Sequence, residues 1–275
     1  MINSNCNIYQ PNFYANLKSP KLNFRREDFF IKIHGYGRSN TWADIIIKTA
    51  DDAVKSIRKK STFNFVLKKI TQGVIKANQI PLDLHKRERT GFLRIPRPGW
   101  NYPKDWNNNC LITRYDKKGC PKYRSYADRF DKIINEPLIE PYGNISLTKP
   151  VNSNGEKYLR HGEFWTLDNA LLKIESLYNH LINNFKGTSV NDEDLPTINN
   201  YIAEIRWILA HATPFERGSD AISNVLMKSL YKSFGIKTYP PAKNISFDLE
   251  AYCTNLKDYK KNFTNYFSIP PSVAK

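Results

Sequence analysis

The second half of the chain carries the pattern that most restricts the fold, a succession of apolar residues at helical spacing. After residue 166 the apolar residues recur every three or four positions: Leu167, Leu171, Ile174, Leu177, Leu181 and Phe185. This spacing places them on one face of an α-helix. Similar patterns follow over 194–210, 221–234 and 246–267. Because the pattern over 194–210 is apolar on more than one side, we expect this helix to be central in a helical core.

Residues 144–160 precede these helices with a predicted β-hairpin. Two polar, strand-like arms, 145–149 and 156–160, flank a turn that ends in Asn154-Gly155, a dipeptide typical of hairpin turns. Because the arms are polar, we expect the hairpin to lie on the surface, available to pair with an extended peptide; a purely structural hairpin is the alternative. The sequence therefore predicts a mainly α (α+β) protein with a helical core, a surface β-hairpin and a mixed N-terminal half.

The predicted organisation has three parts. Residues 1–30 are expected to form an irregular arm, 31–140 a mixed and basic N-terminal region, and 141–275 the helical region that includes the hairpin. Within the N-terminal region, strand-like residues 111–115 and 121–123 flank a turn-rich segment and predict a second hairpin.

Positive charge dominates the composition and bears on the partner. The 275 residues include 42 Lys and Arg against 26 Asp and Glu, a formal net charge of +16. This charge suits a polyanionic partner, such as nucleic acid, acidic lipid, nucleotide phosphates or an acidic protein face. The helices predicted over 41–77 expose many lysines. Docking to an acidic protein or a membrane surface is one interpretation of this face, and a solvated helix surface is the other.

Other sequence features bear on the compartment. The chain has no 18-residue apolar stretch, so no transmembrane segment is expected. Its four cysteines lack the spacing of a metal site or a disulfide framework. The first residues lack the basic and apolar regions of a secretory signal peptide. We expect a protein that a non-Sec bacterial secretion system delivers into the host cytoplasm, or otherwise a cytoplasmic protein.

The loop 211–220 concentrates side chains suited to phosphate chemistry. A helix is expected to start directly behind it, and the unpaired N–H groups and positive dipole end of a helix start attract anions. His211 can take a proton from a hydroxyl near neutral pH. The other candidates are Glu216 as a catalytic carboxylate or Mg²⁺ ligand, and Arg217, Gly218, Ser219 and Asp220 as the phosphate-binding helix start. A structural helix–loop–helix corner is the alternative.

This loop and its helices resemble the core of Fic-type (Fido) proteins, whose signature is His-Pro-Phe-x-Asp/Glu-Gly-Asn-Gly-Arg. The resemblance rests on a helix, His211, Pro214-Phe215, Gly218 and a second helix, and covers about 164–241. It implies that His211 deprotonates a target hydroxyl, that an acidic residue holds Mg²⁺ and that the helix start binds nucleotide phosphates. It also implies that the upstream hairpin holds the target segment.

The chain departs from that signature. Ala212 and Thr213 separate His211 from the Pro-Phe pair, Arg217 stands where the acidic residue belongs, and Glu216 falls one position early. The loop is more loosely similar to that of bacterial effector AMPylases that use a separate Ser with His-x-x-x-Glu.

The predicted function is that of a secreted bacterial effector or toxin. It would transfer a nucleotidyl (AMP) or phosphoryl group from ATP or another nucleotide, with Mg²⁺, to a host protein hydroxyl. His211 would be the general base, and Arg217, Gly218 and Ser219 would bind the phosphate. One alternative is a toxin or binder that acts on nucleic acid through its basic surface. The other is a non-catalytic effector that docks on a host protein.

Overall fold

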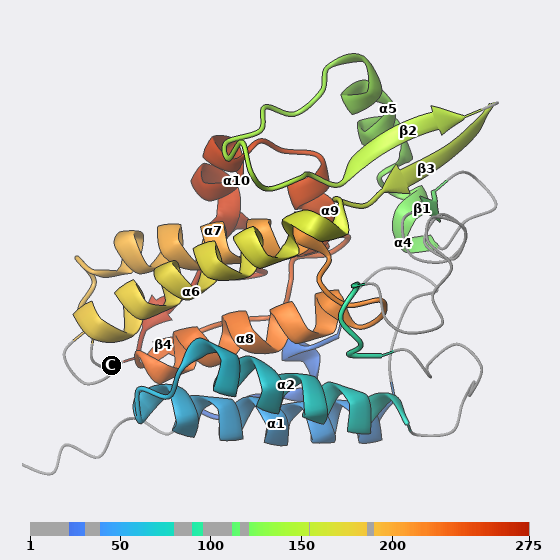
Figure 1. Ribbon diagram of the computed structural model, residues 1–275. Helices are drawn as coiled ribbons and strands as arrows, with labels where there is room; N and C mark the ends of the chain where they lie inside the picture. Colours follow the sequence, from blue (N-terminus) through green and yellow to red (C-terminus); the bar gives the residue numbers. More distant parts are fainter. Residues whose placement is uncertain are drawn as a thin grey trace, which may run out of the picture.

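A computed structural model of the chain describes residues 22–30, 39–79, 90–95, 112–115, 121–153, 155–185 and 190–274. The protein is mainly α with a little sheet, as predicted (Figure 1). The expected arm over 1–30 is described only from residue 22, where it contains the short 3-10 helix η1, Arg26–Asp28. None of the described helices has the length and apolar character needed to cross a membrane.

The first two helices confirm the helices predicted over 41–77, and they form a helical hairpin. α1 spans Asn40–Arg58 and α2 spans Phe63–Asn78, and the two helices pack against each other. The side chain of Ser39 caps α1 and that of Thr62 caps α2, each by accepting a hydrogen bond from a backbone N–H in the first turn.

Three long helices form the centre of the molecule. α6 (Leu167–Asn184) follows a short 3-10 turn, η3 (Phe164–Thr166). α7 spans Leu195–Ala212 and α8 spans Ser219–Ser233. In Figure 1, α8 lies between the α1–α2 pair and the α6–α7 pair, and it contacts α1, α2 and α7. The predicted central position of the 194–210 helix is confirmed, since α7 is buried continuously from Ile202 to Ala212.

The predicted single helix over 246–267 is wrong. The chain instead forms α9 (Phe247–Tyr252), α10 (Leu256–Asn262) and the 3-10 helix η4 (Phe263–Tyr266). Asn255 explains the break because its side chain accepts a hydrogen bond from the N–H of Asp258 at 3.0 Å and so begins a new helix. The short strands β4 (Ile236–Lys237) and β5 (Ser272–Val273) pair with each other nearby.

The sheet confirms a hairpin within residues 144–160 but corrects its first arm, and it corrects the other predicted hairpin. The first arm was expected over 145–149, whereas the strand covers 149–153, so most of the segment expected as the turn is strand. β2 (Lys149–Ser153) and β3 (Glu156–Arg160) are antiparallel, with Val151 opposite Tyr158. The second predicted hairpin is wrong because Pro121–Arg124 is a helix, α4, which leads to α5 (Ala127–Asn135). β1 (Ile112–Arg114) pairs instead with β3, so the strand order is β1-β3-β2.

One hydrophobic core crosses the boundary expected near residue 140. Ile46 of α1 and Ile70 of α2 belong to the same buried cluster as Ile208 of α7 and Leu226 of α8. The basic N-terminal region and the helical region are therefore parts of one packed body in the described structure.

Candidate functional site

His211 lies in the core at the end of α7, with an exposed fraction of 0%. Its Nδ1 accepts a hydrogen bond from the N–H of Thr148 at 3.1 Å, and its Nε2 lies 3.0 Å from the carbonyl oxygen of Ala251. The ring also contacts those of Trp207 and Tyr252. Burial lowers the pKa of His211 to about 3. As placed, His211 presents neither ring nitrogen to a ligand, contrary to the geometry that a general base would need.

The same contacts attach the β-hairpin to α7. Thr148 precedes β2, and its hydroxyl donates to the carbonyl oxygen of His211 at 2.8 Å. Gly162 follows β3, and a side chain there would lie 2.4 Å from the carbonyl oxygen of Ser146 and 3.0 Å from that of His211. Only glycine therefore allows this close approach. The base of the hairpin therefore lies beside the start of the 211–220 loop.

Arg94, a residue that the sequence did not single out, holds the C-terminal end of α7. Its guanidinium donates to the carbonyl oxygens of Ala212 (2.8 Å), Thr213 (2.8 Å) and Gly162 (2.5 Å) and is fully buried. These are carbonyl groups of a helix end and its neighbour, where a cation is favourable. Thr213 has a left-handed backbone (φ 42°, ψ 60°), an unfavourable conformation for a β-branched residue.

Backbone hydrogen bonds to segment 90–94 hold the α7–α8 corner, residues 213–218. The N–H of Glu216 donates to the carbonyl oxygen of Phe92 at 2.9 Å, and that of Gly91 donates to the carbonyl oxygen of Arg217 at 3.1 Å. Glu216 is half-buried, whereas Arg217 is exposed. Gly218 has φ +88°, so the chain needs glycine here to enter α8.

Ser219 and Asp220 begin α8 and have structural partners. The hydroxyl of Ser219 donates to the carbonyl oxygen of Phe215 at 2.9 Å and accepts from its N–H, so it does not cap α8. Asp220 accepts from Lys122 at 3.3 Å and from Arg206 in a very short contact. The side chains of Ser219 and Asp220 are therefore engaged within the protein at the helix start.

Lys122, Arg206, Asp220 and Asp248 form an ion cluster under the start of α8. The carboxylate of Asp248 lies 2.7 Å from Nζ of Lys122. Burial by itself would raise the pKa of Asp248, but Lys122 and Arg206 attract its charged form and hold that pKa below its usual value. The cluster contains two positive and two negative groups, as expected for charges removed from water.

Arg206 stands out in this cluster because its hydrogen-bonding capacity is only partly used. Its exposed fraction is 1%, and its Nε and Nη1 atoms have no hydrogen-bond acceptor in the described part of the chain. Such buried donors usually have a water, ion or ligand as their partner. Arg206 could have been suspected from the sequence because it interrupts the apolar run Ile205 to Leu209, but the identity of its partners is not local information.

Glu216 is the Mg²⁺ ligand predicted from the sequence, and the part of the chain that the structure describes places no set of further metal ligands beside it. Within the described ranges, no group of three or more His, Cys, Asp or Glu side chains is placed to hold a metal ion. Mg²⁺ can bind through one or two carboxylates and substrate phosphates, so the role of Glu216 stays a prediction.

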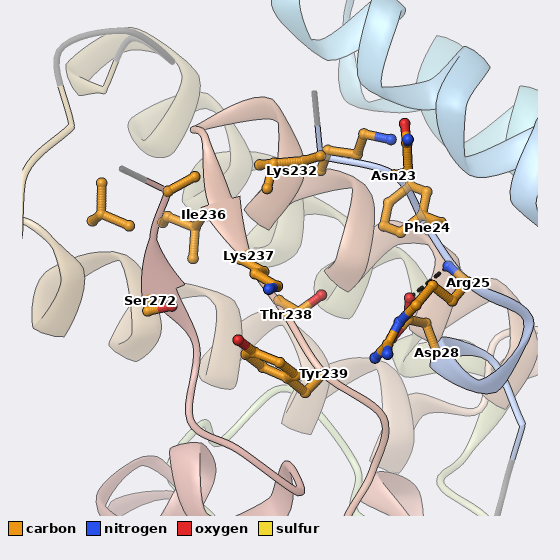
Figure 2. Close-up of a pocket in the computed structure, with 13 residues that line it drawn as sticks. Asn23, Phe24, Arg25, Asp28, Lys232, Ile236, Lys237, Thr238, Tyr239 and Ser272 are labelled. Atoms are coloured by element: carbon orange, nitrogen blue, oxygen red, sulfur yellow. Dashed lines mark hydrogen bonds and ion pairs between the residues drawn. The ribbon is translucent and has the colours of Figure 1, made fainter. Parts of the chain in front are cut away.

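A surface pocket of about 580 Å³ lies away from the corner (Figure 2). It is lined by the N-terminal segment 22–25, by Asp28, by Lys232 of α8 and by residues 236–239 and 272–274. None of the site residues predicted from the sequence lines this pocket.

Comparison with protein families identifies a different relationship from the one inferred from the loop. Residues 139–270 match the avirulence protein family AvrB_AvrC. The matched region contains the hairpin, α6 to α10 and the α7–α8 corner. Over this region the chain is similar to avirulence proteins. A comparison with curated proteins gives no match.

This match corrects the resemblance to Fic-type proteins, which was wrong. That resemblance depended on residues of one helix–loop–helix corner, and such corners recur in unrelated helical proteins. The family match supports the broader prediction of a bacterial effector with a host protein target. It gives no support to AMP transfer of the Fic type.

Proposed function

We propose that the chain is a bacterial effector, delivered into host cells by a non-Sec route, that binds a host protein through the β-hairpin and the α7–α8 corner. The similarity of residues 139–270 to avirulence proteins supports the effector class. The observation that carries the site is the attachment of the hairpin to the corner through Thr148 and His211. These two hydrogen bonds connect the base of the hairpin to the end of α7, where the corner begins.

The hairpin offers a strand edge to the partner. β2 pairs only with β3 among the described strands, so its other edge is not taken by a described strand. Pro150 in β2 agrees with an edge position because proline lacks the N–H that a central strand needs. Ion pairs steady the flanking segments: Lys149 lies 2.6 Å from Glu140, and Lys157 contacts Asp131. An extended host segment would add to this edge through backbone hydrogen bonds.

The corner would take an anionic group of the partner or of a second ligand. The α8 start supplies backbone N–H groups and a positive dipole end. Arg217 lies just before α8 in the chain and is exposed. Arg206 of α7 contacts Asp220 at the start of α8 and has two donors without a described acceptor. A phosphate is the group that suits such donors best, so ATP or another nucleotide is the natural first ligand to test.

Anion binding is tested by titrating the protein with ATP and with inorganic pyrophosphate. Because a hydrogen bond to a charged group contributes roughly 1.5–3 kcal/mol, Arg217→Ala should weaken binding at least about tenfold. Lys257→Ala is the matched control, since Lys257 is an exposed cation on α10. Equal affinity of the wild type and Arg217→Ala would rule out the corner as the anion site.

Group transfer is the second candidate function, and the same ligand allows its test. A nucleotidyl or phosphoryl transferase would label a host protein when given ATP carrying the label on the α- or the γ-phosphate, with Mg²⁺. Since His211 is enclosed by Thr148 and Ala251, a transferase of this geometry would need a base other than this ring. If neither form of labelled ATP labels a protein in host extract, group transfer is ruled out and host-protein binding is the only one of the two candidate functions that stands.

The strand-edge part is tested with a photo-crosslinking residue at Asn152 in β2 and, as the control, at Lys257 in α10. We expect a host protein to be crosslinked from Asn152 and not from Lys257. An identical set of crosslinked proteins from both positions would contradict docking at the hairpin.

A further inference from the structure

The stretch 53–82 contains no Asp or Glu, although it carries seven Lys and Arg residues. Its described residues, 53–79, form the second half of α1, the turn that follows it and α2 with its C-cap. Helices of soluble proteins usually mix both signs of charge on their exposed faces. A stretch of two packed helices in which every charged residue is a cation therefore needs a separate explanation.

Five exposed residues at the closed end of this helical hairpin form what we call the lysine patch: Lys59, Lys60, Phe65, Lys68 and Lys69. Lys59, Lys60 and Lys68 have no acidic partner in the described part of the chain. Nζ of Lys69 lies 3.3 Å from the hydroxyl of Ser56 and 4.8 Å from the centre of the Phe65 ring. Phe65 is 48% exposed, so the patch has an apolar centre surrounded by cations.

Lys60 has a backbone conformation that residues other than glycine and asparagine rarely adopt. Its φ is 54°, the left-handed conformation in which helices usually end with glycine or asparagine. The turn is closed by hydrogen bonds from Lys60 N–H to Ile57 and from Ser61 N–H to Ser56. The turn therefore places the exposed Lys60 side chain at the closed end of the helical hairpin.

The patch lies at the opposite end of the molecule from the tip of the β-hairpin. In Figure 1 the turn between α1 and α2 and the tip formed by β2 and β3 are on opposite sides of the central helices. A surface that holds the protein by the lysine patch would therefore leave the hairpin and the α7–α8 corner free for a host protein.

We propose that the lysine patch docks the protein on a membrane surface that contains anionic phospholipids. The cations of the patch are all lysines, which attract charge without the planar two-pronged geometry by which arginine selects a single carboxylate or phosphate. Lysines beside an exposed aromatic ring fit the headgroup region of a bilayer, where the ring enters the acyl boundary and the ammonium groups stay in the polar layer.

The charge reversal Lys59→Glu, Lys60→Glu and Lys68→Glu tests this proposal in the full chain. Each lysine near an anionic bilayer strengthens partitioning about fivefold, so loss of three lysines alone weakens binding roughly a hundredfold. The triple variant also adds three negative charges and should therefore bind at least about a hundredfold less to vesicles of phosphatidylcholine with phosphatidylserine. Binding by the wild type should fall as salt is raised and be absent on phosphatidylcholine alone. Phe65→Ala should reduce binding severalfold without changing its dependence on salt.

The matched control is Lys243→Glu, Lys257→Glu and Lys261→Glu, which removes the same charge from exposed residues outside the patch. This variant should retain most of the binding. An equal loss in both triple variants would mean that only the net charge of +16 matters, and the proposal would fail. Binding to polyglutamate but not to the vesicles, lost only in the patch variant, would point to an acidic protein and would also overturn it. Circular dichroism of each variant confirms that it is folded.

Discussion

At the scale of single residues, His211 has a structural role, because it connects the end of α7 to the base of the β-hairpin and to α9. The N–H of Thr148 points at Nδ1, so Nδ1 must be unprotonated, and the proton on Nε2 is directed to the carbonyl oxygen of Ala251. If the ring were protonated, Nδ1 would carry a hydrogen that points at the N–H hydrogen of Thr148, and the hydrogen bond between them would be lost. A second buried ring, His161, lies 3.4 Å from the hydroxyls of Thr148 and Thr213. Burial lowers its pKa to about 3 as well.

These two rings predict a loss of stability in mild acid. Their pKa values are about 3 in the folded protein against 6.5 for an ordinary histidine, so between these pH values the unfolded chain binds more protons. The two rings make their full contribution to the free energy of unfolding above pH 6.5. This contribution falls as the pH falls toward 3, by about 1.4 kcal/mol per pH unit for each ring. Urea unfolding at a series of pH values measures this slope.

Single variants show which histidine is responsible for the slope of stability against pH. His161→Gln and His211→Gln should each be less stable near neutral pH but should lose stability less steeply as the pH falls, because one proton uptake on unfolding is removed. The same slope in the wild type and in both variants would show that other groups control the acid transition.

At the scale of elements, the contact between α1 and α2 depends on one glycine. A side chain at Gly73 would lie 2.1 Å from Oγ1 and 2.7 Å from Cβ of Thr49, closer than atoms can approach. Thr49 cannot turn away without losing the hydrogen bond from its hydroxyl to the carbonyl oxygen of Ile45 at 2.8 Å. The glycine is therefore kept in the interior of α2 in spite of its poor helix propensity.

Gly73→Ala should destabilise the protein even though alanine is the better helix former. Overpacking costs about 1–3 kcal/mol and alanine gains roughly 1 kcal/mol in a helix interior. Because the clash at Gly73 reaches Cβ of Thr49, we expect the cost to exceed the gain, with a net loss of up to about 2 kcal/mol. The double variant with Thr49→Ala removes the two closest contacts and should recover part of this loss. Denaturant unfolding measures both, and an increase in stability for the single variant would contradict the close packing.

At the scale of the whole molecule, the region similar to avirulence proteins depends on helices outside it. α8 packs against α1 and α2, and the hydroxyl of Ser229 donates to the carbonyl oxygen of Ala50 at 3.2 Å. Arg94 holds the end of α7 from another segment outside the matched region. The core therefore belongs to the whole described chain.

A fragment of residues 139–275 should fail to fold cooperatively. Without α1 and α2, α8 would expose apolar residues such as Val225 and Leu226, which are fully buried in the complete chain. We expect a broad denaturant transition and increased binding of an apolar dye, with the full chain as control. A sharp transition like that of the full chain would show that the matched region is an independent domain.

Local pattern was sufficient for most of the helices and for one hairpin. Helical spacing predicted α6, α7 and α8, because a stripe of apolar residues must be buried wherever the helix packs. Asn154-Gly155 located the turn between β2 and β3, because few dipeptides adopt that backbone. The break before α10 was missed because the capping residue Asn255 lies within a continuing apolar pattern.

The tertiary structure alone decided what the residues of the 211–220 loop can do. A histidine at a helix end can act as a base on the surface or connect elements within the core. For His211 this depends on contacts with Thr148 and Ala251, which are far away in the chain. The same holds for Arg94 and Arg206, whose partners come from other elements. Accessibility and pKa arise from contacts between distant segments, whereas periodicity arises from neighbours in sequence. The sequence by itself therefore determined the helices of this protein, and only the fold determined the chemistry available to their side chains.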